Sequence, residues 1–466
     1  MHNPARYLPK RPTASYWLKD LKMPVADPLP SRTVDAAIIG AGITGLSVAR
    51  RLQELKPEWQ IVVIEGRQLC GGATGRNGGL LIPGLQDGWT STAARVGEAQ
   101  TRKLFRFDLQ NAVALSQFVS SYISNGGEPD PFLHSFKDGC LNAFATEAQR
   151  DFWTAEVEKM QDAGACGEGM FTILDRKQVA GMLGTDKFCG AVQIKPGFRV
   201  WGARLVLALA QDVLAKNKSP PPGKAGGRVN FCTETLVRKV EFASESGGSW
   251  TSPPLHRIIT DREGDGPGTL TARNVVFCTN SHTRTLLPDI PIVPVKNQVI
   301  VTQPISPFPA FDGCVSANDG YEYFSAREDG RLVLGGMRNL APDMAVGNGD
   351  DASLDPVIST ALRSYIHDTF PHIRDKVEIE MEWAGIMGFS ADRLPFVGPV
   401  GEDRPGVFVC AGYTGHGMPR AFLSGYHTAE MVAGVKVGED FPEILLPHGR
   451  LGKAERVPID TYKSSS

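Results

Sequence analysis

A glycine-punctuated stretch near the start of the chain constrains its fold more than any other feature. An apolar run at residues 36–39 leads into three glycines, after which apolar residues recur at the spacing of a helix. This pattern predicts a buried strand, a tight turn and a helix, as in the first half of a βαβ unit. A second apolar run at residues 61–64 predicts the next strand, which ends in Glu65. The glycines follow the spacing GxGxxG: Gly40, Gly42 and Gly45.

The order of strand, glycine turn, helix and acid predicts a dinucleotide site. Glycines let the backbone turn sharply and approach a pyrophosphate, and free N–H groups at the helix N-terminus bind its negative charge. Glu65 lies twenty residues after Gly45, where a carboxylate accepts hydrogen bonds from ribose hydroxyls. A merely structural glycine turn is the alternative, and it would not require the acid. The first part of the predicted cofactor site comprises Gly40, Gly42, Ile43, Thr44, Gly45, Glu65, Gly66 and Arg67.

A second glycine-rich loop indicates which dinucleotide the chain binds. NAD enzymes usually continue from the second strand into another βαβ repeat, whereas this chain runs directly into GGATGRNGG at residues 71–79. A backbone with so few side chains can lie flat against a large planar ligand and donate N–H groups to it, which points to a flavin. The loop adds Gly72, Ala73, Thr74, Arg76, Asn77, Gly78 and Gly79 to the predicted cofactor site.

These motifs give the chain a family resemblance. The stretch from Gly40 to Gly79 resembles the start of the D-amino-acid oxidase superfamily of FAD-dependent oxidoreductases, and its second loop is most similar to that of γ-glutamylputrescine oxidoreductase-like members. The similarity extends across nearly the whole chain. It implies FAD as the cofactor and an α/β fold, in which a discontinuous Rossmann-like domain of the glutathione-reductase type binds FAD and an α+β domain built on a mixed sheet binds the substrate.

The resemblance also implies how the chain is divided, and 466 residues are enough for two domains. Residues 1–33 are expected to form an N-terminal extension, with one amphipathic turn at residues 16–18 packed on the domain surface. Residues 243–270 are predicted to form a hairpin insertion. The expected FAD-binding domain comprises residues 34–90, 190–290 and 392–445. The expected substrate domain comprises residues 91–189 and 291–391.

A second sequence of strand, glycine turn and helix lies near the other end of the chain. An apolar run at residues 407–411 leads into a glycine turn, and a helix is predicted at residues 421–432. In the family, such a turn directs helix N-terminal N–H groups at the pyrimidine edge of the flavin, where negative charge collects on reduction. The resemblance therefore adds further residues to the predicted cofactor site: Val237, Thr279, Asn280, Gly412, Gly415, His416, Gly417 and Met418.

Composition argues against several other classes of protein. A formal net charge of −2 gives no basic excess for nucleic acid, and no apolar stretch reaches the roughly 18 to 20 residues of a membrane span. The eight cysteines include no CxxC pair, and several lie in apolar strands, so we expect buried free thiols and a cytoplasmic location. No spacing of His or Cys residues suggests a metal site.

The resemblance implies oxidation of a C–N bond, in which a primary or secondary amine gives a hydride to the flavin and becomes an imine. Oxygen or another acceptor would then remove the electrons. No general base is assigned, because an uncharged amine needs none. Met387 stands where amino-acid oxidases place a carboxylate-binding arginine and sarcosine oxidases a flavin-linked cysteine, and Val333 stands where sarcosine oxidases place an oxygen-activating lysine. We therefore expect noncovalent FAD and a slow reaction with oxygen.

Four residues are candidates for contact with the substrate or the reacting atoms: His416, Arg338, Tyr323 and Met387. Arg338 is a cation for an anionic substrate group or, alternatively, a solvated loop arginine. His416 tunes the flavin or carries protons near neutral pH, or else only its backbone is used. Tyr321 and Tyr323 alternate along a predicted strand, so they cannot both face the site.

Two other functions stay open at this point. The first is an α-amino-acid oxidase or dehydrogenase that uses Arg338 for the substrate carboxylate. The second is an NAD(P)-dependent dehydrogenase, which would need neither the loop at residues 71–79 nor the turn at residues 412–418.

Overall fold

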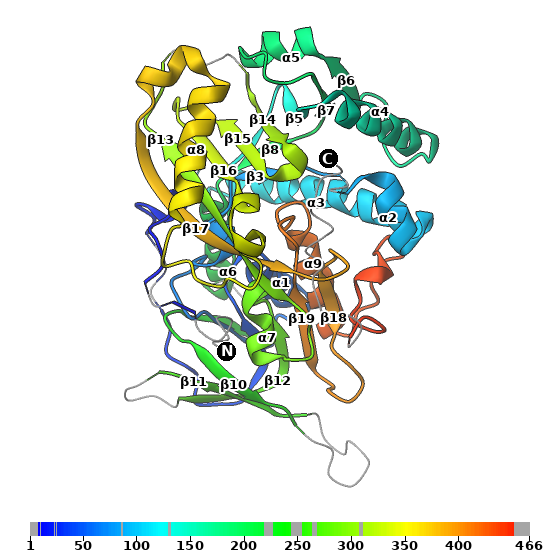
Figure 1. The fold of residues 1–466 in the computed structure, drawn as a ribbon. Helices are drawn as coiled ribbons and strands as arrows, with labels where there is room; N and C mark the ends of the chain where they lie inside the picture. Colours follow the sequence, from blue (N-terminus) through cyan, green and yellow to red (C-terminus); the bar gives the residue numbers. More distant parts are fainter. Residues whose placement is uncertain are drawn as a thin grey trace.

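A computed structural model gives the fold (Figure 1). It describes residues 8–9, 11–22, 24, 26–84, 87–128, 132–218, 227–243, 254–262, 268–306 and 311–451. The start of the predicted N-terminal extension, and residues 244–253 and 263–267 of the predicted insertion at residues 243–270, therefore lie outside the described residues.

The first large sheet carries the predicted nucleotide unit. Its central strands are parallel, and β1 pairs with β2 on one side and with β12 on the other. They are rich in Val and Ile and almost wholly buried, as strands covered on both faces must be. The parallel strands are β1 (Val34–Ile39), β2 (Gln60–Ile64), β9 (Arg228–Cys232), β12 (Thr269–Phe277) and β19 (Val407–Ala411). Antiparallel strands extend it: β10 (Val237–Glu241), β11 (His256–Thr260) and β18 (Phe396–Pro399).

Helix α1 follows the first glycine turn, and its first seven residues are all buried. It runs over Ile43–Leu55 and packs between α6 (Gly202–Lys218) and α9 (Ala421–Val432). Its inward residues share one hydrophobic core with those two helices and with β1 and β2. The α/β arrangement of parallel strands and covering helices is the predicted Rossmann-like fold (Figure 1).

The second large sheet is mixed, with strand order β17-β13-β16-β15-β14-β5-β7-β6. Its strands are β5 (Gly139–Phe144), β6 (Phe171–Asp175), β7 (Gly190–Ile194), β13 (Val293–Thr302), β14 (Gly313–Ala317), β15 (Glu322–Ala326), β16 (Leu332–Gly336) and β17 (Ile379–Phe389). A small sheet contains β3 (Leu80–Leu81), β8 (Phe198–Val200) and β4 (Leu133–Ser135).

Helices flank the mixed sheet and connect it to the first sheet (Figure 1). The remaining α-helices are α2 (Gly88–Val96), α3 (Glu98–Ser124), α4 (Glu147–Asp162), α5 (Arg176–Leu183), α7 (Thr283–Leu286) and α8 (Pro356–Thr369). Short 3₁₀ turns are η2 (Tyr16–Leu18), η3 (Ala73–Gly75), η4 (Asn280–His282), η5 (Asn318–Gly320), η6 (Arg338–Leu340), η7 (Pro342–Ala345), η8 (Pro371–Lys376) and η9 (Glu443–Leu445).

Two details differ from the sequence expectations. Strand β7 pairs with β5 and β6 in the mixed sheet, whereas the predicted boundary at residue 190 assigns it to the FAD-binding domain. The expected turn at Tyr16–Leu18 forms but does not lie on the surface, because Trp17 is only 1% exposed and meets the rings of Trp201 and Trp383 edge-on. The domain boundaries themselves stay predictions.

Candidate functional site

A cavity of about 530 Å³ is lined by residues of both large sheets. At one end lie residues that follow β1, β2 and β12, including Gly40, Glu65 and Thr279. At the other end lie side chains of the mixed sheet, including Asn297, Tyr323 and Met387. A ligand in this cavity would therefore meet the carboxyl ends of the parallel strands and the mixed sheet, the position expected for a dinucleotide in an open α/β sheet.

The first glycine turn has the geometry that only glycine allows. Gly40 has a φ of +107°, and a Cβ there would lie 2.5 Å from the carbonyl oxygen of Cys278. A Cβ on Gly45 would lie 1.9 Å from the carbonyl oxygen of Gly40, so this glycine lets α1 pack on the turn and does not itself line the cavity. At the N-terminus of α1, the N-cap residue Gly42 has no side chain, and the N–H of Ile43 donates to the Thr74 hydroxyl at 3.3 Å. Ile43 and Thr44 line the cavity, so the first N–H groups of α1 lie at its wall, where they suit a pyrophosphate.

Glu65 lies at the end of β2 on the cavity wall, beside Gly66. Its carboxylate accepts hydrogen bonds from the N–H groups of Ala41, at 2.9 Å, and Arg67, at 3.0 Å. Loss of surrounding water raises the pKa of this carboxyl, and the two backbone donors oppose that shift. The two N–H groups fix the orientation of the carboxylate, which retains further lone pairs for ribose hydroxyls.

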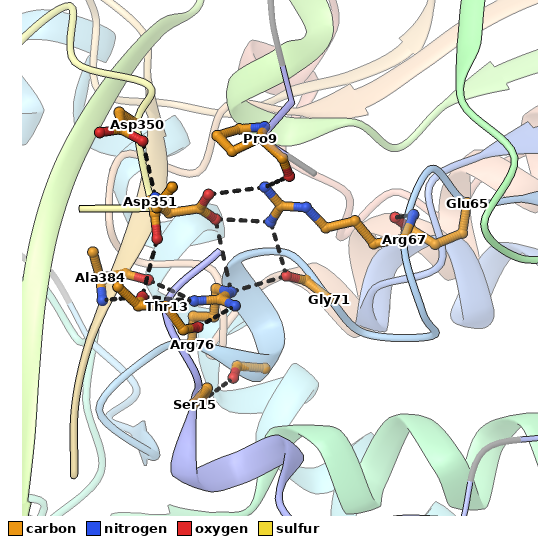
Figure 2. A network of polar contacts seen from close by, with 12 residues as sticks. Pro9, Thr13, Ser15, Glu65, Arg67, Gly71, Arg76, Asp350, Asp351 and Ala384 are labelled. Atoms are coloured by element: carbon orange, nitrogen blue, oxygen red, sulfur yellow. Dashed lines mark hydrogen bonds and ion pairs between the residues drawn. The ribbon is translucent and has the colours of Figure 1, made fainter. Parts of the chain in front are cut away.

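Arg67 and Arg76 line the cavity, but their guanidinium groups are engaged in an internal network (Figure 2). Arg67 makes a two-pronged ion pair with Asp351, at 2.7 and 2.8 Å. Arg76 donates to the carbonyl oxygens of Gly71, Thr13 and Ala384. Burial lowers the pKa of Arg76 to about 10, so the side chain stays charged near neutral pH. The sequence did not point to Asp351, because the pairing joins residues 284 positions apart.

The loop at residues 71–79 lies against the mixed sheet. A Cβ on Gly78 would come within 2.3 Å of the Tyr323 ring, so the contact requires glycine. The Tyr323 hydroxyl accepts a hydrogen bond from the Asn297 side-chain amide at 3.2 Å, and burial raises the pKa of Tyr323. Tyr323 lines the cavity, whereas Tyr321 belongs to the buried core of its sheet. The other predicted loop residues on the cavity wall are Gly72, Ala73, Thr74 and Asn77.

Asn297 is a site residue that the sequence interpretation missed. Its Oδ1 is buried without a hydrogen-bond partner among the described residues, and the side chain lines the cavity. A signal was present, because Asn297 interrupts the apolar face that Val295 and Val299 share at alternate positions of β13. Gly79 was predicted in the site, but it does not line the cavity. Instead, a Cβ there would meet the Trp17 ring at 2.8 Å.

The C-terminal glycine turn reaches the same cavity from the first sheet. Gly415 has a φ of +82°, and His416 follows it with an Nδ1 that is buried and has no partner among the described residues. Burial and the positive charges of Arg420 and Arg393 lower the pKa of His416 to about 3, so its imidazole is neutral near pH 7. Gly412 lies just behind the cavity wall, where its N–H donates to Asn280 Oδ1 at 3.1 Å. The remaining predicted residues on the wall are Val237, Thr279, Asn280, Gly417 and Met418.

Two side chains of β17, Met387 and Phe389, lie beside Gly415 of the glycine turn, and Arg338 lies against Phe389. The Met387 sulfur lies 3.3 Å from the position of a Cβ on Gly415, and the Phe389 ring lies 3.9 Å from it. The guanidinium of Arg338 lies over the rings of Phe389, at 5.3 Å, and Tyr321, at 4.8 Å. Arg338 is 8% exposed, so the alternative of a solvated loop arginine is wrong. It is a cation on the cavity wall that lies against the Phe389 ring.

An apolar wall encloses another part of the cavity. It is formed by side chains of α4, β6 and β7: Trp153, Val157, Met160, Phe171, Val192 and Ile194. Asp319, another residue that the sequence interpretation missed, also lines the cavity, and partial burial raises the pKa of its carboxyl. The apolar wall would exclude water from a reacting group.

Other kinds of site find no support within the described residues. No group of three or more His, Cys, Asp or Glu residues there is arranged to hold a metal ion. No helix in the same part of the chain combines the length and apolar character that crossing a membrane requires. All eight cysteines are free, and seven of them are buried.

Comparisons with known proteins agree with this geometry. The chain is 26% identical over 411 residues to the probable oxidoreductase OrdL of Rhizobium meliloti (strain 1021), which covers 87% of this chain and 84% of the relative. It is also 24% identical over 442 residues to the γ-glutamylputrescine oxidoreductase of Escherichia coli (strain K12). This alignment covers 92% of this chain and 91% of the relative.

A solved structure and a family model complete the comparison. The glycine oxidase from Geobacillus kaustophilus superposes with a TM-score of 0.70 over 91% of this chain and 100% of that chain, at 18% identity, which shows a shared fold. The sequence model described as FAD dependent oxidoreductase matches residues 35–431. The match spans most of the sequence and includes both glycine turns, so this chain belongs to the family of FAD-dependent oxidoreductases.

Proposed function

We propose that this FAD-dependent oxidoreductase oxidises the C–N bond of a primary or secondary amine to an imine. The relatives named above include an enzyme named for an amine-containing substrate and one named for glycine, both of which carry an oxidisable C–N bond. When bound, FAD supplies the acceptor for a hydride, that is, two electrons and one proton. The amine nitrogen loses the second proton, so the balance of the step needs no further oxidant.

The side chains around the cavity would bind and orient the amine. The apolar wall that includes Trp153 and Phe171 keeps water from the reacting carbon and favours an uncharged amine there. The orphaned Oδ1 of Asn297 is an acceptor for an N–H group. His416 is neutral near pH 7, so it serves as a hydrogen-bonding group rather than as an acid.

The position of Arg338 carries the proposal about the substrate class. Met387, next to the glycine turn, offers no donors for a carboxylate, and Arg338 on the same wall lies against the Phe389 ring. Arg393 also lines the cavity, but its guanidinium already pairs with the Asp87 carboxylate at 2.7 Å. An α-amino acid holds its carboxylate one bond from the reacting carbon, so it would bury that charge without a matching pair of donors. We infer that the preferred amine has no anionic group or has one remote from the oxidised carbon.

Anaerobic stopped-flow reduction of the flavin tests this inference. One panel contains simple primary and secondary amines and amines with a distant carboxylate, and the other contains common α-amino acids. Wild type, Arg338→Ala and the exposed-arginine control Arg284→Ala are compared. We expect faster reduction by the first panel, with Arg338→Ala slowing only amines that carry a distant carboxylate. Fast reduction by simple amino acids that is lost in Arg338→Ala would instead establish an amino-acid oxidase.

We make two further proposals, one about the electron acceptor of the reduced flavin and one about the cellular compartment of the protein. Val333 is buried in the core and the chain has no lysine at that position, which supports an acceptor other than oxygen or a slow reaction with oxygen. The eight free thiols support a reducing compartment such as the cytoplasm. Comparing reoxidation of the reduced flavin by oxygen and by an artificial quinone tests the first proposal.

A further inference from the structure

The beginning of the described chain, residues 8–9 and 11–18, lies outside the matched family segment of residues 35–431. These residues nevertheless contact the flavin-binding loop along much of its length. The Ser15 hydroxyl donates to the carbonyl oxygen of Gly75 at 2.7 Å, and the Trp17 indole N–H donates to that of Asn77 at 2.6 Å. Arg76, between these two loop residues, donates to the carbonyl oxygen of Thr13 at 2.8 Å.

The loop at residues 71–79 needs such support, because it has few side chains with which to fix its own shape. Five of its nine residues are glycines, and glycine loses the most conformational freedom on ordering. Hydrogen bonds to the carbonyls of Gly75 and Asn77 hold the backbone in one conformation before the cofactor arrives. The bonds come from a buried segment, since Ser15 is 4% and Trp17 1% exposed.

Thr13 connects this segment to the mixed sheet and to the ion-pair network (Figure 2). Its hydroxyl donates to the carbonyl oxygen of Asp351 at 3.0 Å and accepts from the N–H of Ala384 on β17 at 2.9 Å. The Asp351 carboxylate in turn holds Arg67, which follows the ribose-side acid Glu65. One short segment thus contacts the flavin loop, the mixed sheet and the network at the end of β2.

The same segment also forms part of the cavity wall. Leu8 lines the cavity, and a Cβ on Gly66 would lie 2.9 Å from the Leu8 side chain. Leu8 therefore lies at the end of the cavity where Glu65 would accept hydrogen bonds from the ribose of FAD. The contacts of residues 8–9 and 11–18 extend from this end to the start of β3, where the Trp17 ring faces Gly79.

We propose that residues 8–9 and 11–18 form an N-terminal clamp that belongs to the FAD-binding site and sets the affinity for FAD. The clamp acts by ordering the loop at residues 71–79, so its residues position the cofactor and do not take part in the oxidation. This inference rests on FAD as the cofactor and not on the nature of the amine.

The test removes the hydrogen bonds of the clamp one at a time. Ser15→Ala removes the hydroxyl that reaches Gly75, and Trp17→Phe keeps a ring in place but removes the N–H that reaches Asn77. Lys19→Ala is the control, because Lys19 lies just beyond the clamp and its ammonium donates to Glu380 rather than to the loop. FAD is removed from each protein, and its dissociation constant is measured by titrating the apoprotein and following flavin fluorescence.

We expect Ser15→Ala and Trp17→Phe each to raise the dissociation constant of FAD by about threefold to tenfold, and the control to leave it unchanged. The visible spectrum of the bound flavin and the rate of flavin reduction at saturating FAD should match wild type. Equal FAD affinity in all four proteins would overturn the proposal. So would an altered spectrum or reduction rate that saturating FAD does not restore, since the segment would then act on the chemistry. The titration of FAD needs no amine substrate, so it can be interpreted even if the proposed amine oxidation is wrong.

Discussion

The ring of Tyr323 lies directly against the backbone of Gly78, so that a Cβ at Gly78 would come within 2.3 Å of the ring carbon Cε2. The ring cannot easily move away, because a Cβ at Gly335 would lie equally close to the Tyr323 hydroxyl, and Asn297 donates a hydrogen bond to that hydroxyl. This contact fixes how closely the loop at residues 71–79 approaches the mixed sheet.

Gly78→Ala is therefore expected to displace the loop and weaken FAD binding. Overpacking of this kind costs about 1–3 kcal/mol, which corresponds to roughly a tenfold to hundredfold loss of affinity if it falls on the bound state. The ratio of flavin to protein absorbance after gel filtration measures the loss. Gly181→Ala in α5 is the control, because a Cβ there meets nothing within 4 Å. Full flavin content in Gly78→Ala would show that the loop does not need this contact.

Glu65→Gln should retain the shape of the site but weaken FAD binding. The uncharged amide cannot accept as strongly from ribose hydroxyls, and charge-assisted hydrogen bonds contribute about 1.5–3 kcal/mol each. We expect the dissociation constant of FAD to rise by about tenfold or more for each bond lost, as measured by isothermal titration of the apoprotein. An unchanged constant would mean that the carboxylate serves only the N–H groups of Ala41 and Arg67.

His416 should not titrate in the neutral pH range. Its pKa is lowered to about 3, below the ordinary value of 6.5, so the unfolded chain binds its proton more readily than the folded apoprotein. The stability of the apoprotein should therefore fall as the pH drops from 6.5 towards 3, and His416→Gln should lessen that fall. Flavin reduction between pH 6.5 and 8 should show the same pH dependence in both proteins. A break in the wild-type profile that disappears in His416→Gln would refute the neutral imidazole.

We expect acid precipitation to release intact FAD from the protein. The family resemblance implies that Met387 takes the place of a flavin-linked cysteine, and the cysteines that line the cavity are Cys140 and Cys278. Burial raises the pKa of the Cys278 thiol well above its ordinary value, so this group is a poor nucleophile. Chromatography of the supernatant should recover FAD in proportion to the protein. A yellow pellet would show a covalent bond, and peptide mapping would locate it.

Asp351→Asn should destabilise the protein strongly. The change leaves Arg67 and Arg76 buried without their common carboxylate, and breaking a buried ion pair costs about 3–5 kcal/mol. Denaturant unfolding of the apoprotein measures the loss of stability. Glu241→Gln, which breaks the exposed pair with Lys239, should leave the unfolding midpoint unchanged. Equal midpoints for the two variants would mean that the network contributes no more than a surface pair.

The sequence by itself determined the nucleotide-binding unit and the cofactor. The strand, glycine turn and helix around Gly42 lie within a short stretch, where periodicity and glycine spacing directly report backbone geometry. The same reasoning predicted the second turn at Gly415 and the helix Ala421–Val432, which the structure contains. Both signals are local, so no knowledge of the packing was required.

Only the tertiary structure decided which side chains meet across the cavity. Asp351 joins Arg67 over 284 positions, and Trp17 reaches Asn77 over 60. Asn297 pairs with Tyr323 from a different strand, although its interruption of an apolar face was visible in the sequence. Such contacts depend on strand order, which no local pattern encodes. The burial of Arg338 was undetermined for the same reason: its surroundings come from Tyr321 and Phe389, which the fold brings to it from two other parts of the chain.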